Sequence, residues 1–585
     1  MTSAHNQRLT NLRAVLAARG LDGFIVPRAD EHLGEYVPPN AERLAWLTGF
    51  TGSAGLAVVL ADKAAVFSDG RYTLQLEQET DAALWQRRHI IEDRPEDFLR
   101  AEAPGRRIGY DPWLISPEAL KRFSGIALVA VAQNPVDEIW TDRPAPPLAP
   151  AFAHAEAFAG ESAAAKRAGL AAKLREAAQN AAILTDPASL AWLLNMRGAD
   201  LEFCPFALGY ALLHADATVS LFMAPEKITE QLRAHLGPEV SIAGREALPA
   251  ALAALSGKTV RFDPASMPAA IETALRAAGA HIAEAPDPVA LPRACKNPTE
   301  QQGARAAHRR DGVAMVNFLA WLAANPGQTE LSATEKLLSC RAAAPEFRGE
   351  SFPAISGAGE DGAIIHYRVT PATNRAIKPN EVYLIDSGGQ YPDGTTDITR
   401  TLWTGPDAAP GDIKANVTRV LAGHIALARA VFPEGVAGGH LDAFARQELW
   451  RAGLDYDHGT GHGVGSYLSV HEGPAGISRA ARPVPLQAGM ILSNEPGYYR
   501  QGAYGVRLEN LLLVQPADFP GTPKKFLRFE TLTLVPFDRA LIDPALLNPE
   551  ALAWLNAYHA DVWHALAPGL APAARVWLQT ACAPL

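Results

Sequence analysis

The chain has 585 residues, and 53 Lys+Arg against 63 Asp+Glu give it a formal net charge of −10. A domain usually takes about 100–200 residues, so the length indicates several domains, and the 48% hydrophobic content excludes a disordered composition. The acidic balance argues against a nucleic-acid-binding protein, which would normally carry a basic patch.

The cysteines and the apolar runs indicate the compartment. The four cysteines are scattered and form no CxxC pair, so the sequence supports neither a zinc ribbon nor a disulfide scaffold. The N-terminal residues are polar and contain no apolar stretch of the signal-peptide type. No run of about 18 apolar residues occurs, and the best candidate, 313–324, is interrupted by Asn317. We therefore expect a cytoplasmic protein that neither is secreted nor spans a membrane.

Two stretches in the first half of the chain have a similar order. A helical pattern over 9–16 is followed by a short buried strand at 24–26, and a second one at 170–174 is followed by a strand at 182–184. The tetrapeptide LAWL follows each of these strands. The spacing is far too long for a solenoid repeat, which favours two related α/β domains in tandem. Chance agreement in an Ala- and Leu-rich chain is the alternative.

Proline-rich stretches at 143–150 and 284–298 predict linkers, because proline stops helices and restricts the residue before it. After the second stretch, Asn297 predicts a helix cap, with a proline in the first turn and Glu300 reaching back to the cap. A last helix is expected from Asn548, and its apolar stripe predicts packing on its own domain, with a partner chain as the alternative. The predicted domains are 1–150, 151–295, 296–537 and 538–585.

The third predicted domain concentrates acids and histidines. A strand by composition, 382–385, ends in Asp386, and another strand begins at Asp397. The turn formers between them favour an arrangement with the two carboxylates close together. Buried together, the carboxylates would repel and lose solvation, and a divalent cation would offset both costs. The alternative is a pair of exposed turn aspartates.

Further along, Glu495 follows an apolar run, and 506–509 is predicted as one strand. Period-two alternation would put Arg507 and Glu509 on the same face of that strand, so that Arg507 can orient a neighbouring carboxylate. The alternative, a surface Arg–Glu face, agrees poorly with the apolar 511–514 that follows.

Three histidines lie close together beside glycines. His458 and His462 have the i, i+4 spacing of a helical zinc site, but the glycines between and after them oppose a helix, and the glutamate of an HExxH motif is missing. A loop that brings the imidazoles of His458, His462 and His471 to a bound group is more natural. Four carboxylates with one imidazole form a hard ligand set that suits Mn²⁺, and they exceed what one divalent ion needs. Two metal ions about 3.5–4 Å apart explain the excess.

At this point the sequence resembles the "pita-bread" metallopeptidases, which include methionine aminopeptidase and prolidase. It is most similar to the long, three-domain Xaa-Pro aminopeptidases (aminopeptidase P). The resemblance covers nearly the whole chain. It rests on GFTGSAG, SDGRYTLQ and LAWLLNMRGAD in the first half, on GAIIHY, IDSGGQYPDGTTDITRT, HGTGHGVGSYLSVHEGP, NEPGYY and GVRLEN in the third domain, and on the C-terminal segment from 532 onward.

The resemblance implies an α/β (α+β) fold: two tandem creatinase-like α/β domains, a pita-bread catalytic domain, and a C-terminal extension packed on it. It also implies a dinuclear metal site. Asp386 would bind one ion, His462 and Glu495 the other, and Asp397 and Glu509 would bridge the two. A hydroxide between the ions would be the nucleophile, with Glu495 as its proton acceptor.

The resemblance assigns the remaining site residues to the peptide. His471 would steady the tetrahedral oxyanion, His366 would contact the substrate, and His458 would line the proline pocket, with Arg507 also in the substrate-binding set. The nine positions show no departure from the family pattern.

The implied reaction is release of the N-terminal residue from a peptide with proline in second position. Prolidase, which cleaves only Xaa-Pro dipeptides, is the rival function; creatinase chemistry and an inactive peptide- or protein-binding module are disfavoured because all five ligand positions are intact. The expected cofactors are two divalent ions, Mn²⁺ first and Co²⁺ or Zn²⁺ next. A homodimer is expected, whereas nucleic acid and membrane partners are not.

Overall fold

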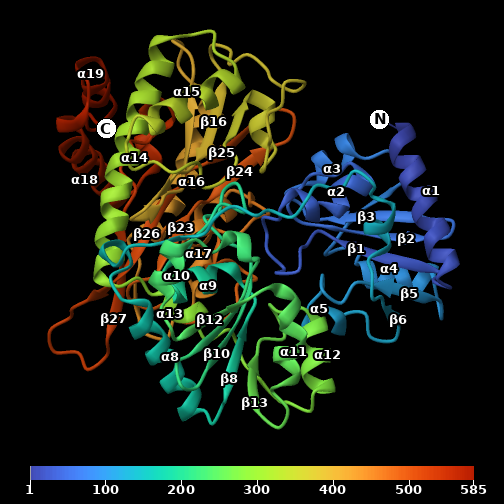
Figure 1. Ribbon diagram of the computed structural model, residues 1–585. Helices are drawn as coiled ribbons and strands as arrows, with labels where there is room; N and C mark the ends of the chain where they lie inside the picture. Colours follow the sequence, from blue (N-terminus) through green and yellow to red (C-terminus); the bar gives the residue numbers. More distant parts are fainter. Residues whose placement is uncertain (1) are drawn as a thin grey trace. The chain divides into compact units, whose positions relative to one another are not determined.

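The computed structural model describes residues 2–585. It contains two compact units, and Figure 1 labels many of their helices and strands. The first unit comprises the residues up to His154 and Glu161–Ala290, and the second comprises Ala155–Gly160 and Leu291–Leu585. The predicted linker 284–298 thus contains a boundary between the units, whereas the predicted linker 143–150 lies within the first unit.

The first unit holds two six-stranded sheets. The first sheet has the order β4-β3-β2-β1-β5-β6, and the second has the order β12-β11-β10-β8-β13-β14. The strands of the first are β1 (Gly23–Pro27), β2 (Leu56–Leu60), β3 (Ala64–Ser68), β4 (Gln86–His89), β5 (Arg107–Tyr110) and β6 (Ala127–Ala130). Those of the second are β8 (Ala181–Leu184), β10 (Tyr210–His214), β11 (Val219–Phe222), β12 (Val240–Ala243), β13 (Thr259–Phe262) and β14 (His281–Glu284).

The two sheets match strand for strand. β1 is antiparallel to β2 and parallel to β5, as β8 is antiparallel to β10 and parallel to β13. The outer strands repeat the same senses. Both LAWL segments are helical, in α2 (Arg43–Thr48) and α9 (Pro187–Leu193), and each helix lies between the first and second strands of its sheet along the chain. The prediction of two related α/β domains in tandem is therefore confirmed.

Helices complete this unit. In α1 (Thr2–Ala18), Leu9, Leu12 and Leu16 are buried in a cluster with Phe24 and Val26 of β1, as the helical pattern predicted. The other helices are α3 (Thr73–Glu79), α4 (Pro95–Glu102), α5 (Pro117–Lys121), α6 (Pro135–Ile139), α8 (Ala163–Glu176), α10 (Glu230–Leu236), α11 (Leu248–Ala253) and α12 (Ala269–Ala277). A two-stranded pair joins β7 (Phe152–Ala153) and β9 (Met196–Arg197).

The second unit begins with α7 (Glu156–Ala159) and, after α13 (Ala290–Ala294) at the junction, the long α14 (Pro298–Ala324). The predicted cap of α14 is confirmed: Asn297 Oδ1 accepts from the N–H groups of Thr299 and Glu300, each at 3.0 Å, and Glu300 Oε2 accepts from Asn297 N at 3.0 Å. Both partners lie within one helical turn, which is why the sequence was sufficient to predict them. The next helix is α15 (Glu330–Ala342).

Two sheets position the side chains that matter below. A three-stranded antiparallel sheet has the order β15-β16-β19, and a six-stranded sheet has the order β20-β27-β26-β23-β21-β22. The strands of the smaller sheet are β15 (Ile355–Ala358), β16 (Val382–Ser387) and β19 (Ile398–Trp403). Those of the larger sheet are β20 (Val431–Pro433), β21 (Gly461–Gly463), β22 (Glu472–Ile477), β23 (Ile491–Asn494), β26 (Asn510–Ala517) and β27 (Phe526–Thr531).

The unit also contains two hairpins and two further helices: β17 (Gln390–Tyr391) with β18 (Gly394–Thr395), β24 (Gly497–Arg500) with β25 (Tyr504–Arg507), α16 (Gly411–Ala428) and α17 (Asp442–Trp450). The prediction of a single strand over 506–509 is wrong, because β25 ends at Arg507 and β26 begins at Asn510. β25 pairs with β24 and β26 pairs with β23, so the chain changes sheets at Leu508 and Glu509. Alternation along one strand is therefore not what places Arg507 and Glu509.

The C-terminal segment forms α18 (Pro549–Leu566) and α19 (Pro572–Ala581). Asn548 caps α18 as predicted, with its side chain accepting from Ala551 N at 2.8 Å. The apolar stripe packs within its own unit, since Leu555, Val562 and Leu566 share a buried cluster with residues of α14 and α16. Among residues 2–585, no helix is both long and apolar enough to cross a membrane.

Candidate metal centre

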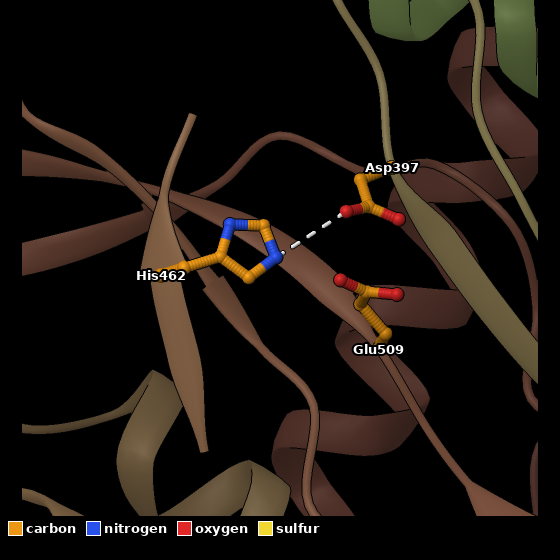
Figure 2. A group of neighbouring side chains, drawn as sticks. All are labelled: Asp397, His462 and Glu509. Atoms are coloured by element: carbon orange, nitrogen blue, oxygen red, sulfur yellow. Dashed lines mark ion pairs between the residues drawn. The ribbon is translucent and has the colours of Figure 1, made fainter. Parts of the chain in front are cut away.

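Five elements of the second unit bring the predicted metal ligands together. Asp386 lies in β16, Asp397 directly precedes β19, His462 lies in β21, Glu495 directly follows β23, and Glu509 directly precedes β26. One ligand atom each of Asp397, His462 and Glu509 lies within 4.8 Å of the others (Figure 2). His462 Nε2 is 3.5 Å from Asp397 Oδ2 and 3.4 Å from Glu495 Oε1.

Strand pairing explains why these side chains meet. In the antiparallel β16–β19 pair, Asp386 lies opposite Thr399, so Asp397 falls just past the end of the same ladder. Thr399 also connects the two sheets: its carbonyl accepts from Glu509 N at 3.1 Å, and its hydroxyl donates to Glu509 Oε2 at 2.8 Å. The carboxylates of Asp386, Asp397 and Glu509 are thereby collected around one residue of β19.

His462 and Glu495 share a hydroxyl partner. Ser493 Oγ accepts from His462 N at 2.9 Å and donates to Glu495 Oε1 at 3.0 Å. The prediction of a loop is correct for His458 but wrong for His462, which lies in the short strand β21 with a bulge at His462 and Gly463. No helix contains the His458–His462 pair, as the glycines predicted.

Arg507 donates two hydrogen bonds to one oxygen of Asp386. Its Nη2 and Nε donate to Asp386 Oδ2 at 2.7 and 3.2 Å, and the guanidinium is buried. Asp386 Oδ1 and Glu509 Oε1 are also buried, and neither has a hydrogen-bond partner among residues 2–585. An unpartnered buried carboxylate oxygen is costly, and a cation is the partner that hard oxygen donors suit best. The residues present therefore fit a divalent metal site.

The pKa values of Asp386, Glu509 and His462 reflect the negative charge of the neighbouring carboxylates. Burial raises the pKa of Asp386 to about 6 despite Arg507, and the charge of Asp397 adds to the rise. Burial, followed by the charges of Asp397 and Asp386, raises the pKa of Glu509 well above its usual range. Burial alone would lower the pKa of His462, but the hydrogen bond to Asp397 and the charge of Glu495 raise it to about 9. These shifts reflect the cost of burying several carboxylates together, which a bound cation would offset.

Contacts connect two of the predicted substrate histidines, and the neighbour of the third, to the residues of the cluster. The rings of His471 and His462 meet edge to face, with centroids 4.4 Å apart. His458 Nε2 lies 2.9 Å from the hydroxyl of Tyr499, which accepts from Arg507 Nη1 at 2.7 Å. Arg507 Nη1 also donates to the carbonyl of Ile365, the residue before His366, at 3.3 Å.

Sequence reasoning missed Tyr499, Thr399 and Ser493. Tyr499 joins Arg507 to His458, and Thr399 and Ser493 hold the carboxylates in place. Their positions in the sequence could have indicated them, because Tyr499 and Ser493 lie on either side of Glu495 in the SNEPGYY segment and Thr399 lies two residues after Asp397. Their contacts depend on pairings between strands distant in sequence.

Four parts of the chain match known families. Residues 302–516 match metallopeptidase family M24, and 525–585 match the C-terminal region of that family. Residues 8–139 and 142–300 each match a creatinase/prolidase N-terminal domain.

Full-length relatives have similar sequences. A Laccaria bicolor protein named "Probable Xaa-Pro aminopeptidase P" is 39% identical, over 99% of this chain and 93% of the relative. Aminopeptidase P2 of Arabidopsis thaliana is 37% identical, over 96% of this chain and 86% of the relative.

A solved structure has the same fold. The X-prolyl aminopeptidase from Caenorhabditis elegans, described as a cytosolic enzyme with a dinuclear active site, matches with a TM-score of 0.94 and 33% identity, over 99% of this chain and 100% of the other. The resemblance drawn from the motifs is thus confirmed. Identity at this level over nearly the full length shows that the chain belongs to the Xaa-Pro aminopeptidase P family of M24 metallopeptidases.

Proposed function

We propose that the protein is a metal-dependent aminopeptidase that releases the N-terminal residue from peptides with proline in second position. One structural observation carries the proposal: Asp397, His462 and Glu509 converge within 4.8 Å, beside buried carboxylate oxygens of Asp386 and Glu509 that lack a partner. Membership of the aminopeptidase P family supplies the substrate class.

We assign the metal ligands as the motifs imply. Asp386 would hold one ion, His462 and Glu495 would hold the other, and Asp397 and Glu509 would contribute to both. When bound, two divalent cations polarise a carbonyl and lower the pKa of water so that it becomes a nucleophile at neutral pH. The hard carboxylate set favours Mn²⁺, with Co²⁺ or Zn²⁺ as alternatives. Arg507 orients Asp386 through its two hydrogen bonds to Oδ2.

The chain's own groups then manage protons and the peptide. Glu495 accepts the proton of the attacking water, and Ser493, which donates to Oε1 at 3.0 Å, holds the carboxylate in place. His471, whose ring meets that of His462, donates to the oxyanion as it develops on the scissile carbonyl. His366 contacts the bound peptide from the segment that Arg507 anchors at Ile365.

His458 forms a wall of the proline pocket with two tyrosines. Its ring lies against Tyr456, with centroids 4.8 Å apart, and against Tyr499 at 5.4 Å. Such aromatic surfaces suit a pyrrolidine ring. A bond to proline nitrogen is a tertiary amide without an N–H, so peptidases that bind this hydrogen handle it poorly and a dedicated pocket is needed.

A tripeptide assay separates this function from its nearest rival. The metal-free protein, supplied with Mn²⁺, is offered Arg-Pro-Pro and the dipeptide Arg-Pro, and free arginine is measured. We expect release from the tripeptide, none from either peptide in a chelator, and none by the Glu495→Ala variant. Cleavage of the dipeptide alone would assign the protein as a prolidase. A protein that binds no Mn²⁺, Co²⁺ or Zn²⁺ and cleaves neither peptide would be a binding module.

Three further properties belong to the proposal. We assign the protein to the cytoplasm. We expect it to be a homodimer. We also expect four domains, with boundaries after residues 150, 295 and 537. The C. elegans protein described as cytosolic supports the compartment. Light scattering at known concentration tests the dimer, since a monomeric mass would contradict it.

A further inference from the structure

A buried acid outside the metal centre holds the segment that carries His366. Glu330 is the first residue of α15 and is fully buried. Its carboxyl accepts three hydrogen bonds: from Ala358 N at 2.8 Å, from Tyr367 OH at 3.1 Å and from Arg375 N at 3.2 Å. Its backbone N–H donates to the carbonyl of Arg375 at 3.1 Å.

The three donors belong to one segment, residues 359–375 with Ala358 before it: two donors lie at its ends and the third lies in its middle. Ala358 is the last residue of β15, and Arg375 lies at the far end of the connection that leads to β16. Tyr367 lies between them and directly follows His366. A single carboxyl therefore sets the spacing between the stems of the 359–375 segment and the position of the residue next to His366.

The position of this segment matters for the site. The carbonyl of Ile365 accepts from Arg507 Nη1 at 3.3 Å, and the same guanidinium binds Asp386. The segment is thus held at two points on either side of His366, by Arg507 at Ile365 and by Glu330 at Tyr367. Tyr367 also packs against Ile355 and Leu384, so the contact with Glu330 fixes the hydroxyl end of a ring that is already buried beside His366.

Glu330 meets this role through hydrogen bonding rather than through an ion pair. Among residues 2–585, no lysine or arginine side chain forms an ion pair with Glu330. The Arg375 guanidinium donates instead to Glu381 Oε2 at 3.0 Å and to the carbonyl of Ala358. Burial raises the pKa of Glu330 to about 7, against the lowering effect of the backbone N–H groups of Ala358 and Arg375. A buried carboxyl is costly, and the three loop donors offset that cost.

We propose that Glu330, through Tyr367, is a positioning residue that sets His366 for peptide binding. The inference rests on the proposed role of His366 in the aminopeptidase. It predicts that loosening Tyr367 weakens peptide binding while leaving metal binding and the chemical step largely intact, because none of the three donors contacts a proposed metal ligand.

The test compares two Tyr→Phe variants with the same neighbourhood. Tyr367→Phe removes the hydroxyl that donates to Glu330 Oε2 at 3.1 Å and also lies 3.2 Å from the carbonyl oxygen of Thr373, within the same 359–375 segment. Tyr383→Phe is the matched control, since its buried hydroxyl bonds Ser356 Oγ at 2.7 Å, beside Glu330, without contacting the 359–375 segment. KM and kcat for Arg-Pro-Pro, Mn²⁺ affinity by calorimetry and Tm are measured for both, for His366→Ala and for the His366→Ala/Tyr367→Phe double variant.

We expect Tyr367→Phe to raise KM by about tenfold, the loss of one hydrogen bond to a charged group, with kcat changed less than about twofold. Mn²⁺ affinity should stay at the wild-type value, and Tyr383→Phe should leave KM unchanged. The double variant should have the KM of His366→Ala, because Tyr367 acts through His366 and the two effects should not add. Glu330→Ala should also raise KM. If Glu330→Ala does not fold, the comparison of Tyr367→Phe with Tyr383→Phe is sufficient for the test.

The failures can be told apart. If His366→Ala raises KM but Tyr367→Phe matches Tyr383→Phe in KM, kcat and Tm, the inference is overturned and the role of His366 stands. Additive effects in the double variant would also overturn the inference. If His366→Ala leaves KM unchanged, the proposed role of His366 fails, and the inference fails with it.

Discussion

Arg507 holds Asp386 through two nitrogens on one oxygen, with Nη2 at 2.7 Å and Nε at 3.2 Å from Oδ2, and this leaves Oδ1 buried and unpartnered. The guanidinium is shared with Tyr499 and with the carbonyl of Ile365. A single side chain therefore contacts a proposed metal ligand, the tyrosine beside the proposed proline pocket and the segment of His366.

Arg507→Lys should weaken metal binding, because one ammonium group cannot donate to all of these partners at once. We expect Mn²⁺ affinity to fall by about 10- to 100-fold, as for other residues that orient metal ligands. Calorimetric titration of the metal-free protein measures it. Arg500→Lys, an exposed position on the neighbouring strand β24 in a 3.5 Å pair with Asp412, is the control. Equal affinity in the two variants would remove the orienting role.

Glu495→Gln should separate the proton-accepting role of this residue from ligation, because the amide keeps an oxygen donor but cannot take the proton. We expect kcat to fall by about 10²- to 10⁴-fold with at least part of the metal retained. Single-turnover rates and metal content measured on the same sample check this. Glu530→Gln, in a partly exposed pair with Arg305, should behave as wild type. Retained turnover with retained metal would exclude Glu495 as the acceptor.

Asp397→Ala should abolish turnover by a different route, through metal loss. Asp397 contributes to the three-residue cluster and lies 3.5 Å from His462 Nε2, so its removal takes away a proposed bridge between the ions. Metal analysis after dialysis should show less bound metal than in Glu495→Gln. Turnover near the wild-type level would contradict the two-metal mechanism.

Metal binding should release protons. His462 has a pKa raised to about 9, so its protonation stabilises the metal-free protein below about pH 6.5, and that contribution is lost as the pH rises through about 9. Ligation needs the neutral ring, so Mn²⁺ affinity should rise across this window. The raised pKa of Glu509 acts in the same direction. Calorimetry at about pH 7.5 in buffers of different ionisation enthalpy counts the protons, and a count of zero would refute the linkage.

His471→Ala should act on the chemical step. A donor to the developing oxyanion is worth about 10²- to 10³-fold in kcat, so we expect a loss of that size with a smaller change in KM. Steady-state kinetics on Arg-Pro-Pro measures both constants. His281→Ala, an exposed histidine in the first unit, is the control. A change confined to KM would instead assign His471 to ground-state binding.

Local chemistry was well predicted from the sequence. The capping box at Asn297 and Glu300, the cap at Asn548 and the leucine face of α1 all depend on residues within a turn or two of one another. The strand that contains Asp386 and the strand that follows Asp397 were also predicted, since turn formers separate them. Such signals survive folding because their partners are nearby in the chain.

The errors arose where strand pairing overrides local pattern. The 506–509 segment has a strand-like sequence, yet β25 ends at Arg507 and β26 begins at Asn510, because the residues before and after Leu508 and Glu509 pair with different strands, β24 and β23. The glycines around His462 favoured a loop, but pairing with β22 and β23 makes it a strand.

The sequence by itself determined the family, the tandem repeat of the N-terminal fold and the acids and histidines available for chemistry, because long motifs and local propensities are written into neighbouring residues. Only the tertiary structure decided which of them meet. It placed Asp397, His462 and Glu509 within 4.8 Å, gave Asp386 its partner Arg507, and gave the His366 segment its anchor at Glu330. These contacts join residues far apart in sequence, and the register of paired strands and the burial of the core, rather than any local pattern, bring them together.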